Sequence, residues 1–279
     1  MSYFQAIIIG LLQGVTELFP ISSLGHSVLL PSLFGWTNIV QAQTAKESFF
    51  LAFLVGLHCA TAIALIIFYR AEWMKLMRAL LVTLQTRKIV NPAEKLIWLI
   101  ILATIPVGLF GLAFEHLLRT VFAKPLAAAI FLTINGLILF FGERLRVRSQ
   151  KKRLISSLSR TDAVIIGSSQ ILALFAGISR SGSTMVAGLM RGLDHEESAH
   201  FSFLLATPLI LAAGVYKLPD LFGANGNGVR GQILIGSIVA GLAAYVSIRF
   251  LSRYFQSKTL LPFAIYSLIA GVLMIIRFA

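Results

Sequence analysis

One short segment near the N-terminus carries the residue types that act as acid, base and nucleophile. Gln13 and Glu17 stand four residues apart, so both face the same side of a helix, where they could share a metal ion or a polar ligand. Ser23 and His26 follow at a spacing that brings an imidazole close to a hydroxyl group, which can activate a nucleophile. With Ser22, they open a new short helix, whose N-terminus can bind an anion. The alternative interpretation is a capped helix with a buried, hydrogen-bonded histidine.

A second polar segment, in the C-terminal half of the chain, has the composition of a buried phosphate site. Arg180 is flanked by four hydroxyl residues and two glycines where a helix is expected to begin. Glycines let backbone N–H groups approach an anion closely, hydroxyl groups donate hydrogen bonds, and the planar guanidinium binds two oxygens at once. The segment lacks the Gly-Lys-Ser/Thr of a Walker A loop. A purely structural ion pair between Arg180 and Glu17 is the alternative.

The composition excludes a soluble or a disordered chain. Of the 279 residues, 57% are hydrophobic and 13% are charged, and the mean hydropathy is +0.86. Soluble domains average about 45–50% apolar and about 25% charged residues. Cys59 is the single cysteine, which excludes an internal disulfide and a cysteine-based metal site. The net charge of +13 fits the excess of Lys and Arg in the cytoplasmic loops of membrane proteins, and we expect no nucleic-acid partner.

Stretches without charged residues predict the membrane-spanning elements, because a crossing helix needs about 20 apolar residues. Two apolar stretches, Met1–Trp36 and Asp162–Leu193, are each interrupted by one of the polar segments, which is the pattern of a re-entrant hairpin. We therefore predict an all-α integral membrane protein with a single membrane domain, 1–279, containing six transmembrane helices and two re-entrant helical hairpins. The predicted crossing helices are Ser48–Tyr69, Leu96–Phe114, Pro125–Gly142, Ser198–Tyr216, Gly231–Ile248 and Thr259–Ile276.

The two hairpins resemble each other in sequence. When the chain is shifted by 157 residues, Ala6–Ser27 aligns with Ala163–Thr184, and the identical positions include Gly10, Gln13, Ser22 and Gly25. Three predicted crossings lie between the hairpins, so the second hairpin enters from the opposite face and the repeat is inverted. The expected halves are approximately 1–145 and 160–279. Inverted repeats place a shared site near the membrane midplane, where their discontinuous helices meet.

The distribution of basic residues predicts the orientation. With the N-terminus outside, 17 of the 24 Lys and Arg residues lie on the cytoplasmic side, 6 lie on the outer side, and Arg180 remains in the second hairpin. The positive-inside rule favours this orientation. The two long basic loops, residues 70–95 and 144–160, are interpreted as topology determinants that face the membrane surface and its anionic lipids.

Both polar segments match the motifs of a known family. Gln13–His26 resembles the (E/Q)xxxE and P-x-S-S-x-G-H signature of the bacterial undecaprenyl-diphosphate phosphatases, the bacitracin-resistance family. Ala176–Thr184 resembles the second family motif, PGxSRSxxT, with Ala176 in place of the usual proline. Phe201–Pro208 and Leu261–Tyr266 look like further family segments, so the resemblance covers nearly the whole chain.

The resemblance implies a multi-pass enzyme of the bacterial inner membrane, with an active site that opens to the periplasm. Its substrate would be a polyprenyl diphosphate lipid, undecaprenyl diphosphate. Removal of the terminal phosphate would regenerate the lipid carrier of peptidoglycan synthesis. The family also implies a divalent metal, Mg or Ca. Gln13 takes the alternative allowed at the first motif position, which weakens the expectation that two carboxylates hold this metal.

The resemblance also implies a role for each motif residue. Glu17 would bind the metal, together with Gln13, or orient a water molecule, and Arg180 would clamp the diphosphate. Ser23 would be the nucleophile, with His26 as its base or as the acid for the leaving group. Direct attack by His26, which would form a phosphohistidine, stays open. The residues expected to donate hydrogen bonds to phosphate are Ser22, Ser179, Ser181 and Thr184.

Some alternatives stay open at the level of the sequence. A secondary transporter or flippase of a phosphorylated lipid would also use inverted repeats with broken helices, although it does not need a serine and a histidine beside a phosphate site. The oligomeric state is open, a homodimer included. Of the other histidines, His58, His116 and His200 are interpreted as packing or interfacial residues and His195 as solvated.

Overall fold

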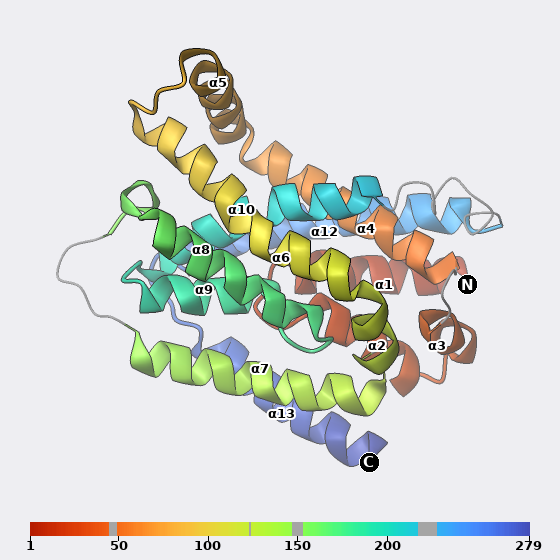
Figure 1. Cartoon of the computed structure of the whole chain (residues 1–279). Coiled ribbons are helices and arrows are strands. Elements are labelled where there is room, and N and C mark those ends of the chain that lie inside the picture. The colour runs from red at the N-terminus through yellow and green to blue at the C-terminus, as the bar shows by residue number, and fades with distance from the viewer. Residues whose placement is uncertain (45–48, 123, 147–152, 217–227) are drawn as a thin grey trace.

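The described part of the chain is a bundle of helices. The structure is a computed structural model that describes residues 1–44, 49–122, 124–146, 153–216 and 228–279; of residues 43–44 and 115–122 only the backbone is described. These residues form helices and turns, with one isolated bridge between Arg153 and Leu193 and no strand. Most helices run side by side, and α5 (Arg70–Thr86) projects from one end together with the beginning of α6 (Pro92–Phe122) (Figure 1). The predicted all-α fold class is confirmed.

Six helices in the described part are long and apolar enough to cross a membrane, as predicted. One of them, α12, continues beyond the predicted end at Ile248. The uncharged stretch stops there because Arg249 follows, but a basic residue does not interrupt helical hydrogen bonding. The six helices are α4 (Phe49–Phe68), α6 (Pro92–Phe122), α7 (Pro125–Leu145), α10 (His195–Tyr216), α12 (Arg230–Tyr254) and α13 (Leu261–Phe278).

The first hairpin consists of α1 (Tyr3–Thr16) and α2 (Ser23–Leu33), joined by a turn at residues 17–22. Ser22 ends the turn and caps α2 with its side chain. Its backbone has φ +72°, a left-handed conformation that is uncommon for residues other than glycine. A short helix, α3 (Thr37–Thr44), follows the hairpin.

The second hairpin consists of α8 (Arg160–Ser169), the 3-10 helix η2 (Gln170–Leu174) and α9 (Arg180–Met190). Gly177 in its turn has φ +115°, a conformation that glycine adopts without steric cost. Ser179 then caps α9 with its side chain, as a serine does in the first hairpin. In both hairpins the polar motif therefore forms the turn and the first residues of the second helix.

The two hairpins make matching contacts with the long helices. Gly10 of α1 lies against Gly236 of α12, where an added Cβ would collide with the Gly236 carbonyl oxygen. Gly167 of α8, which pairs with Gly10 in the predicted repeat, lies against the Ala103 carbonyl oxygen of α6 in the same way. Only glycine permits so close an approach of two helix backbones. These contacts support the division into two halves, which stays a prediction.

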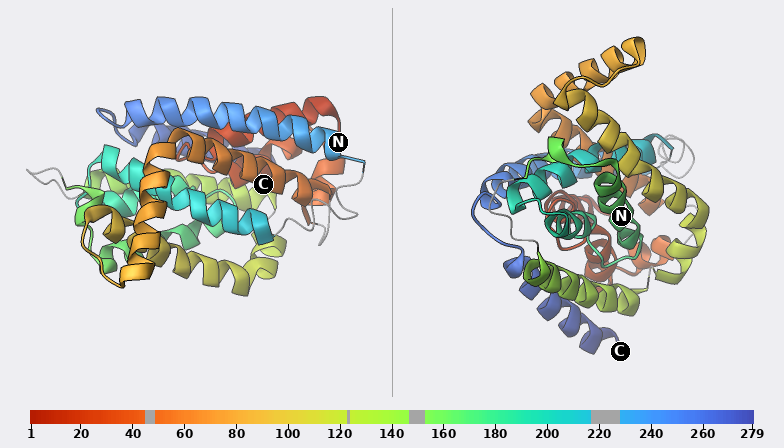
Figure 2. Two further views of the ribbon diagram at one scale, coloured as in Figure 1. Left: turned by 90° about the horizontal axis from the view of Figure 1, so that it is seen from above. Right: turned by 60° about the vertical axis from the view of Figure 1, so that its left-hand side comes forward.

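Both hairpins lie in the middle of the bundle, and longer helices surround them (Figure 2, right). The first helix of each hairpin packs on a long helix, α1 on α12 and α8 on α6, while α2 and α9 both contact α7. The turns are therefore buried in protein, which is the condition for non-helical backbone at membrane depth. Their re-entrant path through a membrane stays a prediction.

Asp162 of α8 connects the two ends of the second hairpin, and it lies outside the six crossing helices. Its carboxylate accepts hydrogen bonds from Arg153 and Arg191, both at 2.6 Å, and from Ser159. Burial by itself would raise the pKa of the Asp162 carboxyl group, but these hydrogen bonds hold that pKa well below its usual range. Arg191 follows α9, so this cluster joins the beginning of the hairpin to its end.

Replacing Asp162 with Asn is expected to lower the melting temperature at pH 7 by about 5 °C, because two guanidinium groups lose their counter-charge. A carboxyl group with a depressed folded pKa stabilises the protein above its unfolded pKa of about 4, and this contribution disappears as the pH falls. Thermal unfolding of the detergent-solubilised proteins should therefore show a difference between wild type and variant that shrinks from pH 7 to pH 3. A difference that is constant over this range would contradict the prediction.

Candidate active site

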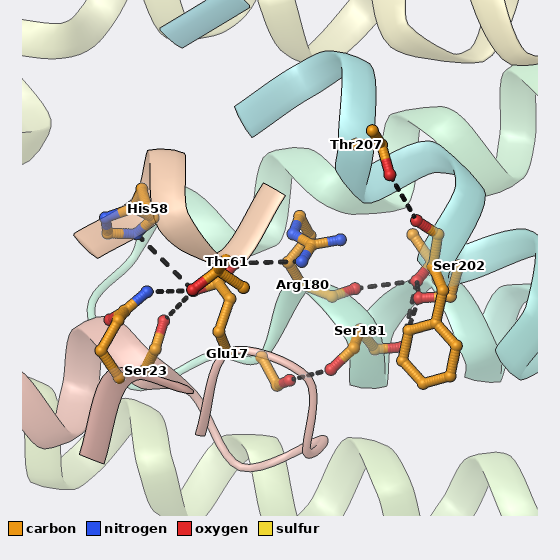
Figure 3. A network of polar contacts seen from close by, with 12 residues as sticks. Glu17, Ser23, His58, Thr61, Arg180, Ser181, Ser202 and Thr207 are labelled. Carbon is orange, nitrogen blue, oxygen red and sulfur yellow. Dashed lines mark hydrogen bonds and ion pairs between the residues drawn. The ribbon is translucent and has the colours of Figure 1, made fainter. Parts of the chain in front are cut away.

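The turns of the two hairpins bring Glu17 and Arg180 together inside the bundle (Figure 3). Nη2 of Arg180 donates a hydrogen bond of 3.0 Å to Oε1 of Glu17, although 163 positions separate them in the sequence. The two side chains are only 7% and 11% exposed. Charges buried this deeply are costly unless they are paired. This ion pair unites the two sequence motifs in one site.

The other oxygen of the Glu17 carboxylate is surrounded by three further polar groups (Figure 3). Oε2 accepts hydrogen bonds from Gln13 Nε2 at 3.0 Å and from Ser23 Oγ at 2.5 Å. His58 Nε2 lies 3.6 Å from the same oxygen. The short contact with Ser23 is typical of a hydroxyl group that donates to a carboxylate. Glu17 is therefore placed to accept the Ser23 proton.

The contact of His58 with Glu17 corrects its interpretation as a packing residue. Nδ1 of His58 lies 2.8 Å from the Leu54 carbonyl oxygen, one turn earlier in α4, and this contact directs Nε2 toward Glu17. A packing role was expected because the residue stands alone in an apolar stretch. The signal that could have identified it is the cost of a polar group within a crossing helix, which by default marks function.

His195 and His200 have their contacts outside this site. His195, which was expected to be solvated, is buried, and its Nε2 lies 2.8 Å from Oε2 of Glu143. The expectation was wrong because α10 already begins at His195, so the polar residues there form a helix start and not a loop. His200 packs on Tyr69 with ring centroids 5.2 Å apart, as predicted, and its Nε2 also lies 2.7 Å from Oε2 of Glu72. The side chain of His116 lies outside the described residues.

Ser22 links the two hairpins. Its Oγ accepts hydrogen bonds from the backbone N–H groups of Gly25, at 3.1 Å, and of Gly177, at 3.2 Å. The backbones cross so closely that a Cβ on Gly25 would lie 2.8 Å from the Gly177 Cα atom. The Ser22 hydroxyl therefore holds the two turns together. Its predicted contact with a phosphate group stays a prediction.

His26 of α2 is held by contacts at both ring nitrogens. Nδ1 lies 2.7 Å from the Ser22 carbonyl oxygen, and Nε2 lies 2.7 Å from the Tyr266 hydroxyl group of α13. A carbonyl oxygen can only accept, so Nδ1 carries the proton and Nε2 accepts the Tyr266 hydroxyl when the ring is neutral. The two rings are also stacked, with centroids 5.8 Å apart. His26 and Tyr266 thus form a hydrogen-bonded pair beside the site.

Asn135 of α7 anchors both turns, and the sequence analysis did not identify it. Its Oδ1 accepts a hydrogen bond from the Ser179 N–H at 2.9 Å. Its Nδ2 donates to the Pro20 carbonyl oxygen at 3.0 Å and to Ser267 Oγ at 3.2 Å. An amide side chain can accept and donate at once, so one buried residue positions both turns against α13. The available signal was a single amide in a predicted crossing helix.

Replacing Asn135 with Leu is expected to destabilise the protein by about 2–4 kcal/mol, because three buried polar groups lose their partner. The melting temperature should fall by about 5–10 °C in thermal unfolding experiments. Thr133→Val is the matched control, because the Thr133 hydroxyl donates to the Ala129 carbonyl within α7 itself. An equal loss in both variants would show that Asn135 does not act as a common anchor.

The hydroxyl groups of the second motif contact protein groups. Ser179 Oγ and Ser181 Oγ lie 3.0 Å apart, and Ser181 donates to the Phe19 carbonyl oxygen of the first turn at 3.2 Å. Thr184 donates to Ser202 Oγ of α10 at 2.6 Å. These contacts fix the start of α9 against the first hairpin and against α10 (Figure 3). The predicted role of these residues as phosphate donors stays a prediction.

One nitrogen of the Arg180 guanidinium group indicates an anionic ligand. Nη2 pairs with Glu17, whereas the buried Nη1 has no hydrogen-bond partner among the described residues. A buried donor without a partner costs about 1–3 kcal/mol, and more when it is charged. Phosphate oxygens are acceptors that match the planar guanidinium group. The unpaired nitrogen therefore favours a phosphate clamp over a purely structural ion pair.

The donors around Glu17 suit a metal ion that arrives with a phosphate ligand. Among the residues that the structure describes, no group of three or more His, Cys, Asp and Glu side chains could hold a metal by itself. Glu17 offers a carboxylate and Gln13 an amide, and Mg and Ca prefer oxygen donors of these kinds. Mg is usually bound by one or two carboxylates together with substrate phosphates and water. The residues present fit that mode of binding.

Known proteins of the family that these motifs indicate are similar to this chain over nearly its whole length. The family model described as bacitracin resistance protein BacA matches residues 6–273. A relative from Frankia alni, named undecaprenyl-diphosphatase 2, is 50% identical over 100% of this chain and 98% of its own length. The undecaprenyl-diphosphatase of Mycolicibacterium paratuberculosis is 50% identical over 97% of this chain and 95% of its own. The protein therefore belongs to the bacitracin resistance protein BacA family.

Proposed function

We propose that this protein is a membrane phosphatase that hydrolyses undecaprenyl diphosphate to undecaprenyl phosphate and inorganic phosphate, which recycles the lipid carrier for peptidoglycan synthesis. The names of its relatives support this activity. The structural observation that carries the proposal is the contact of 2.5 Å between the Ser23 hydroxyl and the Glu17 carboxylate, next to the unpaired Nη1 of Arg180. These groups supply the nucleophile, the base and the anion site that phosphoryl transfer requires.

In the first step, the Ser23 oxygen attacks the terminal phosphorus and the Glu17 carboxylate accepts the hydroxyl proton. A bond forms between Oγ and phosphorus, and the bond from that phosphorus to the bridging oxygen breaks. Undecaprenyl phosphate leaves with the bridging oxygen. Arg180 stabilises the charge on the transferring phosphoryl group, which is the main catalytic requirement of such reactions. Because Arg180 also holds Glu17, one residue positions the base and binds the phosphate.

The second step returns the enzyme to its starting state. A water oxygen attacks phosphorus and forms a bond to it, and the bond between Ser23 Oγ and phosphorus breaks. Ser23 Oγ takes back the proton from Glu17, and inorganic phosphate leaves with the oxygen of the water. We assign the pair of His26 and Tyr266 to proton transfer to or from the inorganic phosphate as it leaves. The Tyr266 hydroxyl is in direct contact with His26, so a proton lost by one of the two residues can be replaced from the other. Both ring nitrogens of His26 are engaged, which favours Ser23 as the nucleophile.

A divalent cation, Mg or Ca, would be held by Glu17 and Gln13 together with the diphosphate. When bound, it would neutralise phosphate charge and favour departure of the lipid phosphate. Removal of divalent cations with EDTA should therefore abolish phosphate release, and added Mg or Ca should restore it. Release that continues in excess EDTA would contradict the metal requirement.

The proposed location is the bacterial inner membrane, with the active site open to the periplasm. The charge distribution supports this orientation, because 17 of the 24 basic residues lie on the predicted cytoplasmic side. The opening of the polar site to the periplasm is what the family resemblance implies. Cysteine labelling from either side of sealed cells, at single exposed positions of the loops, tests the orientation independently of activity.

One experiment separates this proposal from a transporter or flippase of a phosphorylated lipid. Purified protein in detergent, with Mg and undecaprenyl diphosphate, should release inorganic phosphate. A detergent solution has no separate compartments between which a lipid could be transported, so this release would be due to hydrolysis alone. No feature of a transporter requires a serine in contact with a buried carboxylate. Absence of phosphate release in detergent, with transfer of lipid across sealed vesicles, would overturn the phosphatase proposal.

A further inference from the structure

A groove at the C-terminal end of α12 has no part in the proposed reaction. It has a volume of about 450 Å³, and its walls include Arg249, Phe250, Arg253 and Tyr254, followed by Lys258 just beyond the helix. The helical positions recur at intervals of three and four residues, so they share one face of α12. This face combines positive charge with aromatic surface.

The cations of the groove are not explained by contacts with the residues that the structure describes. Arg249, Arg253 and Lys258 are exposed, and no carboxylate in the described part of the chain forms an ion pair with them. They are not needed to complete the helix end either, because its last carbonyl groups accept hydrogen bonds from the backbone of residues 255–258. Three like charges around one groove repel each other and favour a bound anion.

An apolar track leads from the membrane-spanning part of α12 to this groove. Leu242, Val246 and Phe250 follow one another at intervals of four residues, so they line up along the helix. They are exposed by 66%, 67% and 51%, respectively. The helix α12 itself lies at the edge of the bundle (Figure 2, left). A ligand that covers both track and groove must have an apolar chain next to a negative headgroup.

The groove lies at the level where such a ligand would be found. α12 ends at Tyr254, and this end is the one that the distribution of basic residues predicts to face the cytoplasm. Tyrosine is enriched at membrane–water interfaces. Phe250 of the groove stacks on Phe19, in the turn of the first hairpin, with ring centroids 5.9 Å apart. The groove therefore lies next to the hairpin that carries Glu17.

We propose that this groove binds the phosphate headgroup of an anionic phospholipid from the cytoplasmic leaflet. Arg249, Arg253 and Lys258 surround the headgroup, and an acyl chain lies along Leu242 and Val246. Basic pockets on the cytoplasmic side of membrane proteins bind anionic headgroups in this way. The proposal concerns a site separate from Glu17 and Arg180, and it does not depend on the proposed phosphatase activity.

The test uses the full chain in vesicles of phosphatidylcholine that contain a photoactivatable phosphatidylglycerol. Wild-type protein should be labelled on the peptide that contains residues 242–258, and competition with unlabelled phosphatidylglycerol gives the affinity. The triple variant Arg249→Gln, Arg253→Gln and Lys258→Gln should lower this affinity roughly 100-fold, because each surface cation contributes about a factor of five. Unlabelled phosphatidylcholine should not compete.

A second triple variant controls for the general loss of positive charge. Lys75→Gln, Arg78→Gln and Lys88→Gln remove the same charge in and after α5 (Arg70–Thr86), at the same end of the bundle, and should change the affinity less than threefold. An equal loss in both variants would overturn the proposal, as would labelling that is absent from residues 242–258. Competition by inorganic phosphate as effective as that by phosphatidylglycerol would also overturn it, because the apolar track would then contribute nothing.

Discussion

Replacement of Ser23 with Ala is expected to lower kcat/KM for undecaprenyl diphosphate about 10³-fold or more. The variant loses the hydroxyl oxygen that attacks phosphorus, whereas Glu17 keeps its contacts with Arg180, at 3.0 Å, and with Gln13. Removal of a nucleophile lowers turnover far more than substrate binding. Phosphate release in detergent, measured over a range of substrate concentrations, should therefore show a large loss in kcat and a small change in KM.

The same helix provides the matched control for Ser23. Ser32 donates to the Val28 carbonyl oxygen within α2, so Ser32→Ala removes an identical hydroxyl group without touching the site. That variant should keep its activity within about twofold. A stable phosphoenzyme trapped from wild type should be absent from Ser23→Ala. If Ser23→Ala instead keeps most of its activity and an acid-labile phosphoenzyme disappears in His26→Gln, then His26 is the nucleophile.

The membrane-spanning helices were predictable because one physical requirement determines them. A crossing helix must be long and free of charge, and this requirement is visible along a single chain. The ends were less predictable. α12 extends to Tyr254 and α10 begins at His195, since charged residues at a membrane boundary are compatible with a helix although they end an uncharged stretch.

The part of the site that was predictable is the part that lies in the two polar motifs. Its residues are close in sequence, or they belong to the two hairpins that form the predicted repeat. Gln13 and Glu17 are neighbours on α1, and their hydrogen bond follows from spacing alone. The contact of Glu17 with Arg180 required the further inference that the two hairpins meet. Both motifs contain short polar runs, which are conspicuous in an apolar chain.

The residues that the sequence analysis missed are single polar groups on long helices. His58, Asn135 and Tyr266 belong to α4, α7 and α13, and each contacts the site across a helix–helix interface. Spacing along a helix shows which residues share a face, but it does not show which neighbour that face meets. Packing of the whole bundle decides that contact, so these residues could be placed only in three dimensions.

Replacement of Arg180 with Ala is expected to lower kcat/KM about 10³-fold or more, for two physical reasons. The transferring phosphoryl group loses the cation that stabilises its charge, and removal of such a group costs several kcal/mol of transition-state stabilisation. The Glu17 carboxylate, 7% exposed, also loses its partner at Oε1 and becomes an uncompensated buried charge. The melting temperature should therefore fall together with the activity.

Arg180→Lys separates these two effects. A lysine keeps the charge that pairs with Glu17, so the melting temperature should stay close to that of wild type. It lacks the planar fork that binds Glu17 through one nitrogen and a phosphate oxygen through the other, so kcat/KM should still fall about 10–100-fold. A lysine variant with full activity would show that a positive charge is sufficient, and that the unpaired Nη1 does not bind phosphate.

Arg153→Ala supplies the control for loss of a buried ion pair elsewhere in the bundle. Arg153 donates to Asp162, whose side chain is 3% exposed, at the base of the second hairpin. This variant should lower the melting temperature while kcat/KM at a temperature below unfolding stays within about threefold. If Arg153→Ala reduced activity as strongly as Arg180→Ala, loss of stability would explain both results, and the assignment of Arg180 to the phosphate would fail. The distinction therefore depends on two variants together. Arg153→Ala should lose stability without a matching loss of activity, whereas Arg180→Lys should lose activity without a matching loss of stability.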